Sequence, residues 1–342
     1  MNFFVHHKLI NCVGAHRRLP LGNTLIRRGA ADQRLSRTAR FPMKYHQLKA
    51  FVAVADEGSI RAAARRLNVS PAALTKAVKE LELALGVSLV VRTARGVQLT
   101  RFGQQLQVRA SLIVAEMQRA RDDIEQAQGA TTGAVAAAIT PAAAVTILPD
   151  AFRAFRRRFP LARVSIVEGF PGVALPKLHD GSLDFAVSVV VPELLAAEFE
   201  HAQLYASRHV IVARNAHPLA AATSLADLVD ADWLMNPSPE SSTQLMFNCF
   251  AEHGLPAPTR VVECPSYAIA HSLIQGSDLI ASMPEQLLGV EWSRDRIAVL
   301  PIREALPAAS VQVVTRRDSP LTPAAAMLVD CMRDAARRHG LR

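Results

Sequence analysis

The chain has 342 residues, half of them apolar and only four of them cysteine, so it is long enough for two or three domains and is not a disulfide scaffold. Most of its net charge of +9 lies in residues 1–42, which contain eight Lys and Arg but only one Asp. The remaining residues, 43–342, carry a net charge of only about +2. Binding of nucleic acid through overall charge is thereby excluded, and any such affinity must come from the local placement of basic residues.

Residues 1–42 do not have the pattern of a secretory signal, because His6, His7 and Lys8 interrupt the only candidate apolar run. Breakers such as Pro20 weaken a long amphipathic helix of the kind found in mitochondrial presequences. We therefore expect a disordered basic extension, either an upstream-start artefact or a loose basic arm, with Met43 beginning the folded unit. No stretch is apolar enough to predict a membrane span, so we expect no membrane partner and a cytoplasmic protein.

The cysteines Cys12, Cys249, Cys264 and Cys331 lie far apart in the sequence and form no CxxC pair. This spacing argues against a zinc site and fits buried free thiols in a reducing compartment. We expect no metal and no cofactor.

Three short helices are predicted at the start of the folded unit. Apolar residues at helical spacing begin at Tyr45, and Gly58 stops this first helix. The second helix runs from the N-cap Ser59 to the turn at 68–69, and a third begins at Ser70 with Pro71 in its first position and ends at Gly86. We expect its buried face to carry Leu74, Val78, Leu81 and Leu85.

The outer face of this third helix has the residue types of a helix that enters the major groove of DNA. Ala72 and Ala73 permit close approach to base edges, Thr75 can donate or accept, and Lys76 can reach guanine or phosphate. The alternative is an ordinary three-helix unit with solvated charges. The next segment favours DNA binding, because strands at 89–92 and 97–99 predict a two-stranded wing with Arg92 and Arg95 for the minor groove or phosphate. The predicted DNA contacts are Ser70, Pro71, Ala72, Ala73, Thr75, Lys76, Lys79, Arg92 and Arg95.

A long helix is predicted from the N-cap Thr100 to about Gln128. Apolar residues recur along it at spacings of three and four, which makes a heptad-like seam with one polar interruption. Such a seam favours pairing with a second copy of the chain; docking on the chain's own domain is the alternative. The seam consists of Phe102, Leu106, Arg109, Ile113, Met117, Ala120, Ile124 and Ala127.

Beyond Gly129, predicted strands alternate with helices in a βαβαβ order, which indicates a mostly parallel sheet. A second lobe with a similar rhythm begins near Tyr205, and the chain then returns to the first lobe. Two crossings between lobes form a hinge, and the cleft between them is the expected ligand site. The expected elements are strands at 134–139, 163–167, 183–189, 209–213, 233–235, 279–281 and 310–315, and helices at 141–159, 173–179, 244–253, 266–274 and 323–338.

The sequence SIRAAARRLNVSPAALTKAVKELELALGVSLVVRTARGVQLT at 59–100, followed by RFGQQL, resembles the DNA-binding region of LysR-type transcriptional regulators. The resemblance extends over 43–342, since the later segments are similar to the family's two-lobed effector domain, which is like the periplasmic binding proteins. It implies a winged helix-turn-helix, a linker helix and an α/β effector domain in a regulator controlled by a small molecule. It also implies a homodimer or homotetramer on a double-stranded operator, activation or repression, and RNA polymerase as a further partner.

The resemblance also implies effector-binding positions in the cleft, which are Thr140, Phe170, Ser238 and Ser266. Hydroxyls and helix amides suit a carboxylate or sulfonate, and Phe170 can stack on an aromatic ring. The effector half is weakly similar to regulators of aromatic sulfonate and aminobenzoyl compound use. Two departures stand out: Pro71-Ala72 replaces the usual Gln-Pro, so a base-reading Gln is absent, and Ala142 stands where relatives often have a hydroxyl.

The expected domains follow from these elements. They are the extension at 1–42, the DNA-binding domain at 43–101, the linker helix at 102–128 and the effector domain at 130–342, with lobe 1 at about 130–204 and 308–342 and lobe 2 at about 205–307.

Two other classes of protein remain as alternatives. A solute receptor without gene control fits the two-lobed half but leaves residues 44–128 unexplained. An enzyme is disfavoured, since GxSxG, HExxH, P-loop and GxGxxG motifs are missing from the sequence. His179 and His217 stand in no catalytic spacing, and Glu168 and Asp184 have no recognisable catalytic partner.

Overall fold

The computed structural model describes residues 42–94, 96–235, 242–289 and 296–341. The expectations for the extension at 1–41, for Cys12, for Arg95 and for Ser238 therefore lie outside the described residues. In the described part, no helix is long and apolar enough to cross a membrane.

The first module consists of three helices and a two-stranded wing, in the order that the sequence predicts. Gly58 and Asn68 end the first two helices in the left-handed conformation, and the Ser59 hydroxyl accepts the Ala62 N–H at 3.4 Å. Leu74, Val78 and Leu81 are buried as expected, but Leu85 at the end of the third helix is 37% exposed, so its predicted burial is wrong. The elements are α1 (Tyr45–Glu57), α2 (Ile60–Leu67), α3 (Pro71–Leu85), β1 (Val90–Thr93) and β2 (Gly96–Leu99).

The wing is attached to the turn between α1 and α2. The N–H of Val97 donates to the carbonyl of Gly58 at 2.8 Å. Gly96 lies directly beside this contact with φ of +126°, and a Cβ built on it would lie 2.5 Å from the Gly58 oxygen. Only glycine fits here, because both the backbone conformation and the close approach exclude a side chain.

We expect Gly96→Ala to lower the free energy of unfolding by about 1–3 kcal/mol, because the wing must move away from the Gly58 carbonyl. Gly86→Ala is the matched control: Gly86 also has a positive φ, of +70°, but nothing lies within 4 Å of its Cβ position. Urea denaturation of both variants separates two contributions to the loss of stability: the steric clash with Gly58, which only Gly96→Ala has, and the cost of a positive φ for alanine, which both variants have. Equal losses in the two would show that the contact with Gly58 is unimportant.

The long helix α4 (Arg101–Ala127) connects the first module to the rest of the chain. Its Leu106, Ala110 and Val114 pack against Leu48 and Phe51 of α1. The predicted seam shares only Leu106 with this packed side. Its large apolar side chains Phe102, Ile113, Met117 and Ile124 are 53, 42, 41 and 62% exposed.

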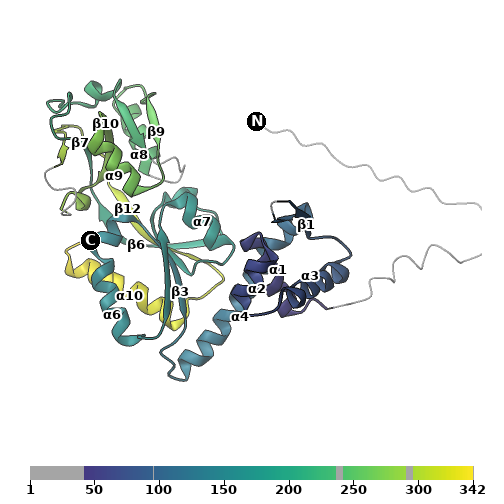
Figure 1. The fold of residues 1–342 in the computed structure, drawn as a ribbon. Coiled ribbons are helices and arrows are strands. Elements are labelled where there is room, and N and C mark those ends of the chain that lie inside the picture. The colour runs from purple at the N-terminus through teal and green to yellow at the C-terminus, as the bar shows by residue number, and fades with distance from the viewer. Residues whose placement is uncertain (1–41, 95, 236–241, 290–295, 342) are drawn as a thin grey trace, which may run out of the picture. The chain divides into compact units, whose positions relative to one another are not determined.

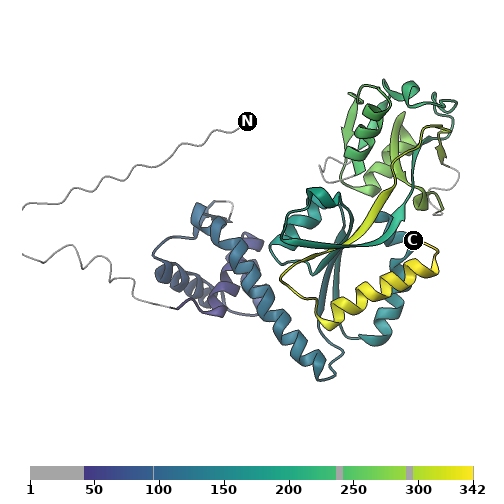
Figure 2. The same ribbon diagram turned by 180° about the vertical axis from the view of Figure 1, so that it is seen from behind.

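The first lobe is built on a five-stranded sheet in the order β4-β3-β5-β12-β6. β3, β4 and β5 run parallel, while β12 is antiparallel to both of its neighbours. Figures 1 and 2 show α10 and α6 side by side on one face of this sheet, and α7 covers the other. The elements are β3 (Ala134–Ile139), α5 (Pro141–Thr146), α6 (Leu148–Arg158), β4 (Arg163–Glu168), α7 (Pro171–His179), β5 (Phe185–Val189), η1 (Pro192–Leu194), β6 (Phe199–Ser207), β12 (Ala309–Arg316) and α10 (Pro323–Arg338).

Two features of this lobe differ from the sequence-based prediction. The single helix expected at 141–159 is two helices, since the chain breaks at Ile147, shortly before Pro149. Proline disfavours helical conformation in the preceding residues and is tolerated only in the first turn of the new helix. The prediction lacks the strand β6, which keeps Tyr205 in the core of the first lobe, and the chain crosses at Arg208, close to the expected crossing near Tyr205.

The second lobe contains another five-stranded sheet, in the order β11-β7-β10-β8-β9. β10 pairs parallel with β8 and antiparallel with β7. Trp233, buried completely at the centre of one core, packs edge-on against Phe250 with ring centroids 5.6 Å apart. The elements are β7 (His209–Arg214), η2 (Leu225–Leu228), β8 (Asp232–Met235), α8 (Ser242–Glu252), β9 (Val261–Glu263), α9 (Tyr267–Gly276), β10 (Leu279–Pro284), η3 (Glu285–Gly289) and β11 (Ile297–Val299).

Candidate functional site

The predicted DNA-contact residues gather around one hollow on the surface of the first module, here called the α3 hollow. Pro71, Ala72, Thr75, Lys76 and Lys79 of α3 line one side of it, and Arg92 of the wing lines the other. Ser70 and Ala73 do not line the hollow. The two form the cap of α3, in which the Ser70 hydroxyl accepts the Ala73 N–H at 3.1 Å.

The side chains of the α3 hollow are held differently. Thr75 donates its hydroxyl hydrogen to the Pro71 carbonyl at 2.8 Å, which fixes its rotamer. Lys76 extends into solvent with 79% of its side chain exposed, and its Nζ lies 3.9 Å from Glu80. An exposed pair of this kind is weak, so the ammonium remains available to another partner.

Arg61 is an exposed residue of the α3 hollow that sequence reasoning missed. It is the second residue of α2. Its side chain reaches the hollow because α2 packs against α3, with Ala63 of α2 and Leu74 and Val78 of α3 in one shared core. The signal was present in the sequence, because a basic residue lies in the first turn of α2, the helix that precedes α3.

A cavity of about 130 Å³ lies between the two lobes of the second half. Thr140, Phe170 and Ser266, three of the four predicted effector residues, line it together. Ser238, the fourth, lies outside the described residues. Thr140 is the N-cap of α5 and its hydroxyl accepts the Ala143 N–H at 3.3 Å.

A hydrogen bond between described residues joins the lobes at this cavity. The backbone N–H of Tyr267, at the start of α9 in the second lobe, donates to Oε1 of Glu168 at the end of β4 in the first, at 2.9 Å. Glu168, for which the sequence shows no recognisable catalytic partner, thus has a structural partner in the Tyr267 N–H. A carboxylate at a helix N-terminus is favourable because the free N–H groups there are positively polarised.

His209 lines the cavity and was not predicted. It begins β7, just after the crossing, and its side chain is buried. Nδ1 lies 3.2 Å from the Ser282 hydroxyl of the paired strand β10, while Nε2 has no hydrogen-bond partner among the described residues. Burial lowers the pKa of His209 to about 4, so the ring is neutral at pH 7.

This neutral ring predicts a pH dependence of stability. An unfolded chain gains a proton on the imidazole below about pH 6.5, but the folded chain does not until about pH 4, so stability falls as the pH falls between these values. We expect a loss of about 2 kcal/mol from this residue between pH 7 and pH 5. Urea denaturation at both pH values, with wild type and His209→Phe, measures it. If His209→Phe lost as much unfolding free energy between pH 7 and pH 5 as the wild type, the pH dependence would not come from His209.

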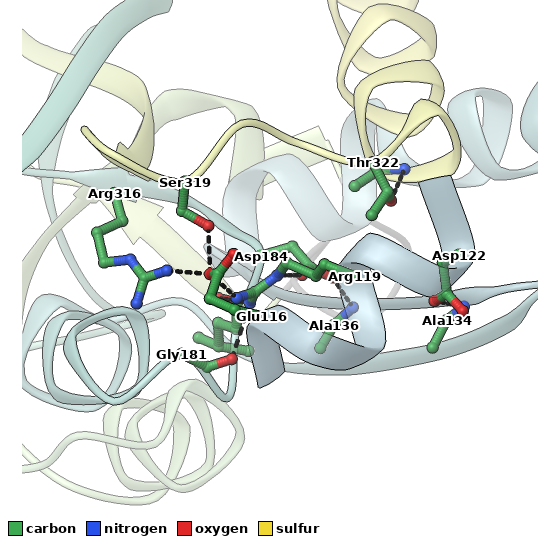
Figure 3. Close-up of polar contacts among 12 residues, drawn as sticks. Glu116, Arg119, Asp122, Ala134, Ala136, Gly181, Asp184, Arg316, Ser319 and Thr322 are labelled. Carbon is green, nitrogen blue, oxygen red and sulfur yellow. Dashed lines mark hydrogen bonds and ion pairs between the residues drawn. The ribbon is translucent and has the colours of Figure 1, made fainter. Parts of the chain in front are cut away.

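A third group of polar residues joins α4 to the first lobe, and we call it the linker cluster (Figure 3). Arg119 of α4 donates from Nε to Asp184 at 2.9 Å and from Nη2 to the Gly181 carbonyl at 2.8 Å. The other carboxylate oxygen of Asp184 accepts the Ala136 N–H at 2.8 Å. The side chains of Arg119 and Asp184 are both only 11% exposed, so the ion pair is largely screened from water.

Glu116 extends the linker cluster to the last strand of the sheet. Its carboxylate pairs with Arg119 at 2.7 Å, accepts the Ser319 hydroxyl at 2.7 Å and pairs with Arg316 at the end of β12. Burial would raise the pKa of Glu116, but the hydrogen bond from Ser319 and the positive charges of Arg119 and Arg316 lower it overall. One turn of α4 is thereby tied to the start of β5 and the end of β12, and through Asp184 to Ala136 of β3.

The two histidines considered above for acid or base chemistry, His179 and His217, have structural partners. His179 Nδ1 lies 2.8 Å from Glu198, and His217 bridges the Leu219 N–H and the Asp278 carbonyl. Among the residues that the structure describes, no group of three His, Cys, Asp or Glu side chains could hold a metal ion. Cys249, Cys264 and Cys331 are buried free thiols, as predicted.

Comparisons with known protein families match nearly the whole of this folded part. Residues 45–104 match the model of the "Bacterial regulatory helix-turn-helix protein, lysR family", and residues 128–337 match that of the "LysR substrate binding domain". The chain is 29% identical over 288 residues to the HTH-type transcriptional regulator GalR of Pseudomonas putida, covering 84% of this chain and 72% of that protein. It is also 29% identical to PcaQ of Agrobacterium fabrum, covering 86% of this chain and 95% of that one.

Solved structures give the same fold. CbnR, described as a LysR family transcriptional regulator, superposes with a TM-score of 0.63 at 24% identity and covers 86% of this chain and 99% of its own. Full-length OxyR from Pseudomonas aeruginosa superposes with a TM-score of 0.64 at 23% identity, covering 86% of this chain and 97% of its own.

Proposed function

Because the chain belongs to the family of LysR-type transcriptional regulators, we propose that its α3 hollow contacts the operator and that its interlobe cavity binds the controlling effector. The family combines a DNA-binding helix-turn-helix with an effector-binding domain, and both parts are present here. We further propose that the protein acts in the cytoplasm, where its DNA target lies, and that RNA polymerase is the machinery it influences.

The observation that supports DNA contact most directly is the composition of the α3 hollow. Its basic residues come from α2, α3 and the wing, which are distant in sequence: Arg61, Lys76, Lys79 and Arg92. The small residue Ala72 lies beside them at the start of α3. A capped helix end with small residues in front and cations around it has the features of a helix that enters the major groove, with the wing on the adjacent backbone.

The proposed assembly is a homodimer formed through α4, with a tetramer as a further step. Phe102, Ile113, Met117 and Ile124 place four large apolar side chains on the exposed side of this helix. Apolar residues repeating every three or four positions pack well against a second helix of the same kind. A dimer of this kind places two α3 hollows on a partly symmetric operator.

Two neighbouring strands supply the proposed coupling between cavity and linker helix. β5 and β12 pair antiparallel, with Val311 opposite Val189 where both line the cavity, and Thr315 opposite Phe185 at the other end. Asp184 precedes β5 and Arg316 ends β12, so the far ends of both strands reach the linker cluster. Ligand-dependent movement of these strands would therefore act directly on α4.

The proposal is tested by selecting genomic DNA fragments with the full-length protein and mapping the bound sites. A shared, partly symmetric sequence among the fragments is the expected result. Recovery of unrelated fragments, with affinity that depends only on salt, would reject sequence-specific binding and favour a solute receptor. Footprints on the recovered operator, with and without candidate small molecules, then test the effector switch; identical footprints at saturation would reject it.

A further inference from the structure

We infer that the interlobe cavity takes an uncharged, mainly apolar ligand of about the size of a substituted benzene, held by one hydrogen bond to His209. This inference rests on the proposed effector function of the cavity and narrows it. Of the effector features that the sequence suggests, it keeps the aromatic ring and disfavours the carboxylate or sulfonate anion.

The walls of the cavity are suited to an apolar body. Phe170, Trp233, Met235, Met246 and Met283 supply large apolar or aromatic surfaces from both lobes. Among the described residues that line it, no Asp, Glu, Lys or Arg occurs. The volume of about 130 Å³ is close to that of apolar cavities that accept benzene, which are about 150 Å³.

Several groups that could hold an anion already take part in hydrogen bonds within the protein. The N-terminus of α9 has the Glu168 carboxylate on its Tyr267 N–H. The Thr140 hydroxyl accepts the Ala143 N–H, and the Ser188 hydroxyl donates to the Gly169 carbonyl. An anionic ligand would therefore enter an apolar space next to a fixed negative charge, after losing its hydration, which is unfavourable.

His209 is a polar group of the cavity with a buried ring nitrogen left unused. Its side chain is only 8% exposed, and Nε2 is buried without a partner among the described residues. If Nδ1 accepts the Ser282 hydrogen, Nε2 carries a hydrogen to donate; if Nδ1 donates, Nε2 accepts. An amide, which has both a carbonyl and an N–H, can pair with either form. The low pKa of the ring means that it does not supply a positive charge for an anion at neutral pH.

The test compares pairs of probes with nearly the same shape and different charge. Full-length protein is titrated at pH 7.5 with benzamide against benzoate and with benzenesulfonamide against benzenesulfonate, and dissociation constants are measured by ligand-observed NMR. We expect each uncharged probe to bind at least about tenfold more tightly than its anion. Anions that bind equally or more tightly would overturn the inference, as would a failure of all four probes to bind.

Variants place the binding in the cavity. Ala270→Leu fills the cavity from α9 and should abolish probe binding, whereas Ala268→Leu, on the exposed side of the same helix, should leave it unchanged. His209→Phe should weaken benzamide about tenfold and leave toluene unaffected, with the exposed His201→Phe as its control. Probe binding unchanged in Ala270→Leu, or toluene and benzamide weakened equally in His209→Phe, would overturn the inference.

Footprints of the same protein preparations on the operator, with and without the probes, test the proposed function separately from the ligand class. If anions bind in the cavity and alter the footprint, the ligand class is wrong but the regulatory function stands. If uncharged probes bind as expected and no ligand alters any footprint, the ligand class stands and the effector switch fails.

Discussion

Arg119→Met is expected to lower the free energy of unfolding by about 3–5 kcal/mol, because it leaves the nearly buried Asp184 carboxylate without its cation. The backbone carbonyl of Gly181 loses its hydrogen-bond donor as well. Methionine keeps much of the apolar volume of the arginine stem, so the loss reports mainly on charge and hydrogen bonding. Urea denaturation of the full chain at pH 7 measures the difference.

Arg333→Met is the matched control for this prediction. Arg333 pairs with Asp330 at 2.9 Å on α10, but both side chains are substantially exposed, at 42 and 64%. Exposed pairs at this spacing contribute less than about 1 kcal/mol, so the variant should remain near wild type. Similar losses in Arg119→Met and Arg333→Met would show that the linker cluster does not hold α4 to the first lobe.

Lys76→Ala is expected to weaken operator binding by about 1–3 kcal/mol for each copy of the chain on the DNA, while the fold stays intact. Its side chain is highly exposed in the α3 hollow, so little packing is lost. A gel shift at fixed salt measures the affinity, and repeating it at several salt concentrations shows whether one phosphate contact has been removed per copy.

Lys177→Ala makes the same change of charge on α7 in the effector half, where the side chain is also exposed. It should leave operator affinity near wild type. An unchanged affinity for Lys76→Ala would remove Lys76 from the DNA contacts, and an equal loss in both variants would indicate a general effect of net charge.

The helices of the first module could be predicted to within a residue because their ends are encoded locally. Gly58 requires the left-handed conformation that glycine adopts easily, and Ser70 with Pro71 both caps and starts α3. The residues of the α3 hollow followed from these ends, since a helix of known start presents known positions outward. Arg61 was missed because its approach depends on how α2 packs on α3.

Two edge strands of the second half, β6 and β9, are harder to predict from the sequence than the central strands. The edge strand β9 is exposed along its whole length, and most of β6 is exposed too, so neither shows an alternation of buried and exposed residues that sequence patterning can detect. The central strands are covered on both faces and are easier to predict, because β3 is a continuous apolar run and β5 is interrupted only by the buried Ser188.

The cavity could be placed from the sequence only in part. Thr140 and Phe170 follow strands of a parallel sheet, where ligand sites are expected, so their positions were predictable. His209 reaches the cavity because β7 pairs antiparallel with β10, which brings it near Ser282 across more than seventy residues. Nothing local to His209 carries that information.

The apolar side chains exposed on α4 imply that the folded fraction of this regulator depends on its own concentration. A single chain carries Phe102, Ile113, Met117 and Ile124 in water, and in the proposed dimer a second copy would cover them and add stability. The melting temperature should therefore rise with protein concentration, and dilution should favour unfolding. A cell that makes few copies holds a smaller folded fraction than one that makes many, so the dose response of the regulated genes is expected to be steeper than the number of chains alone implies.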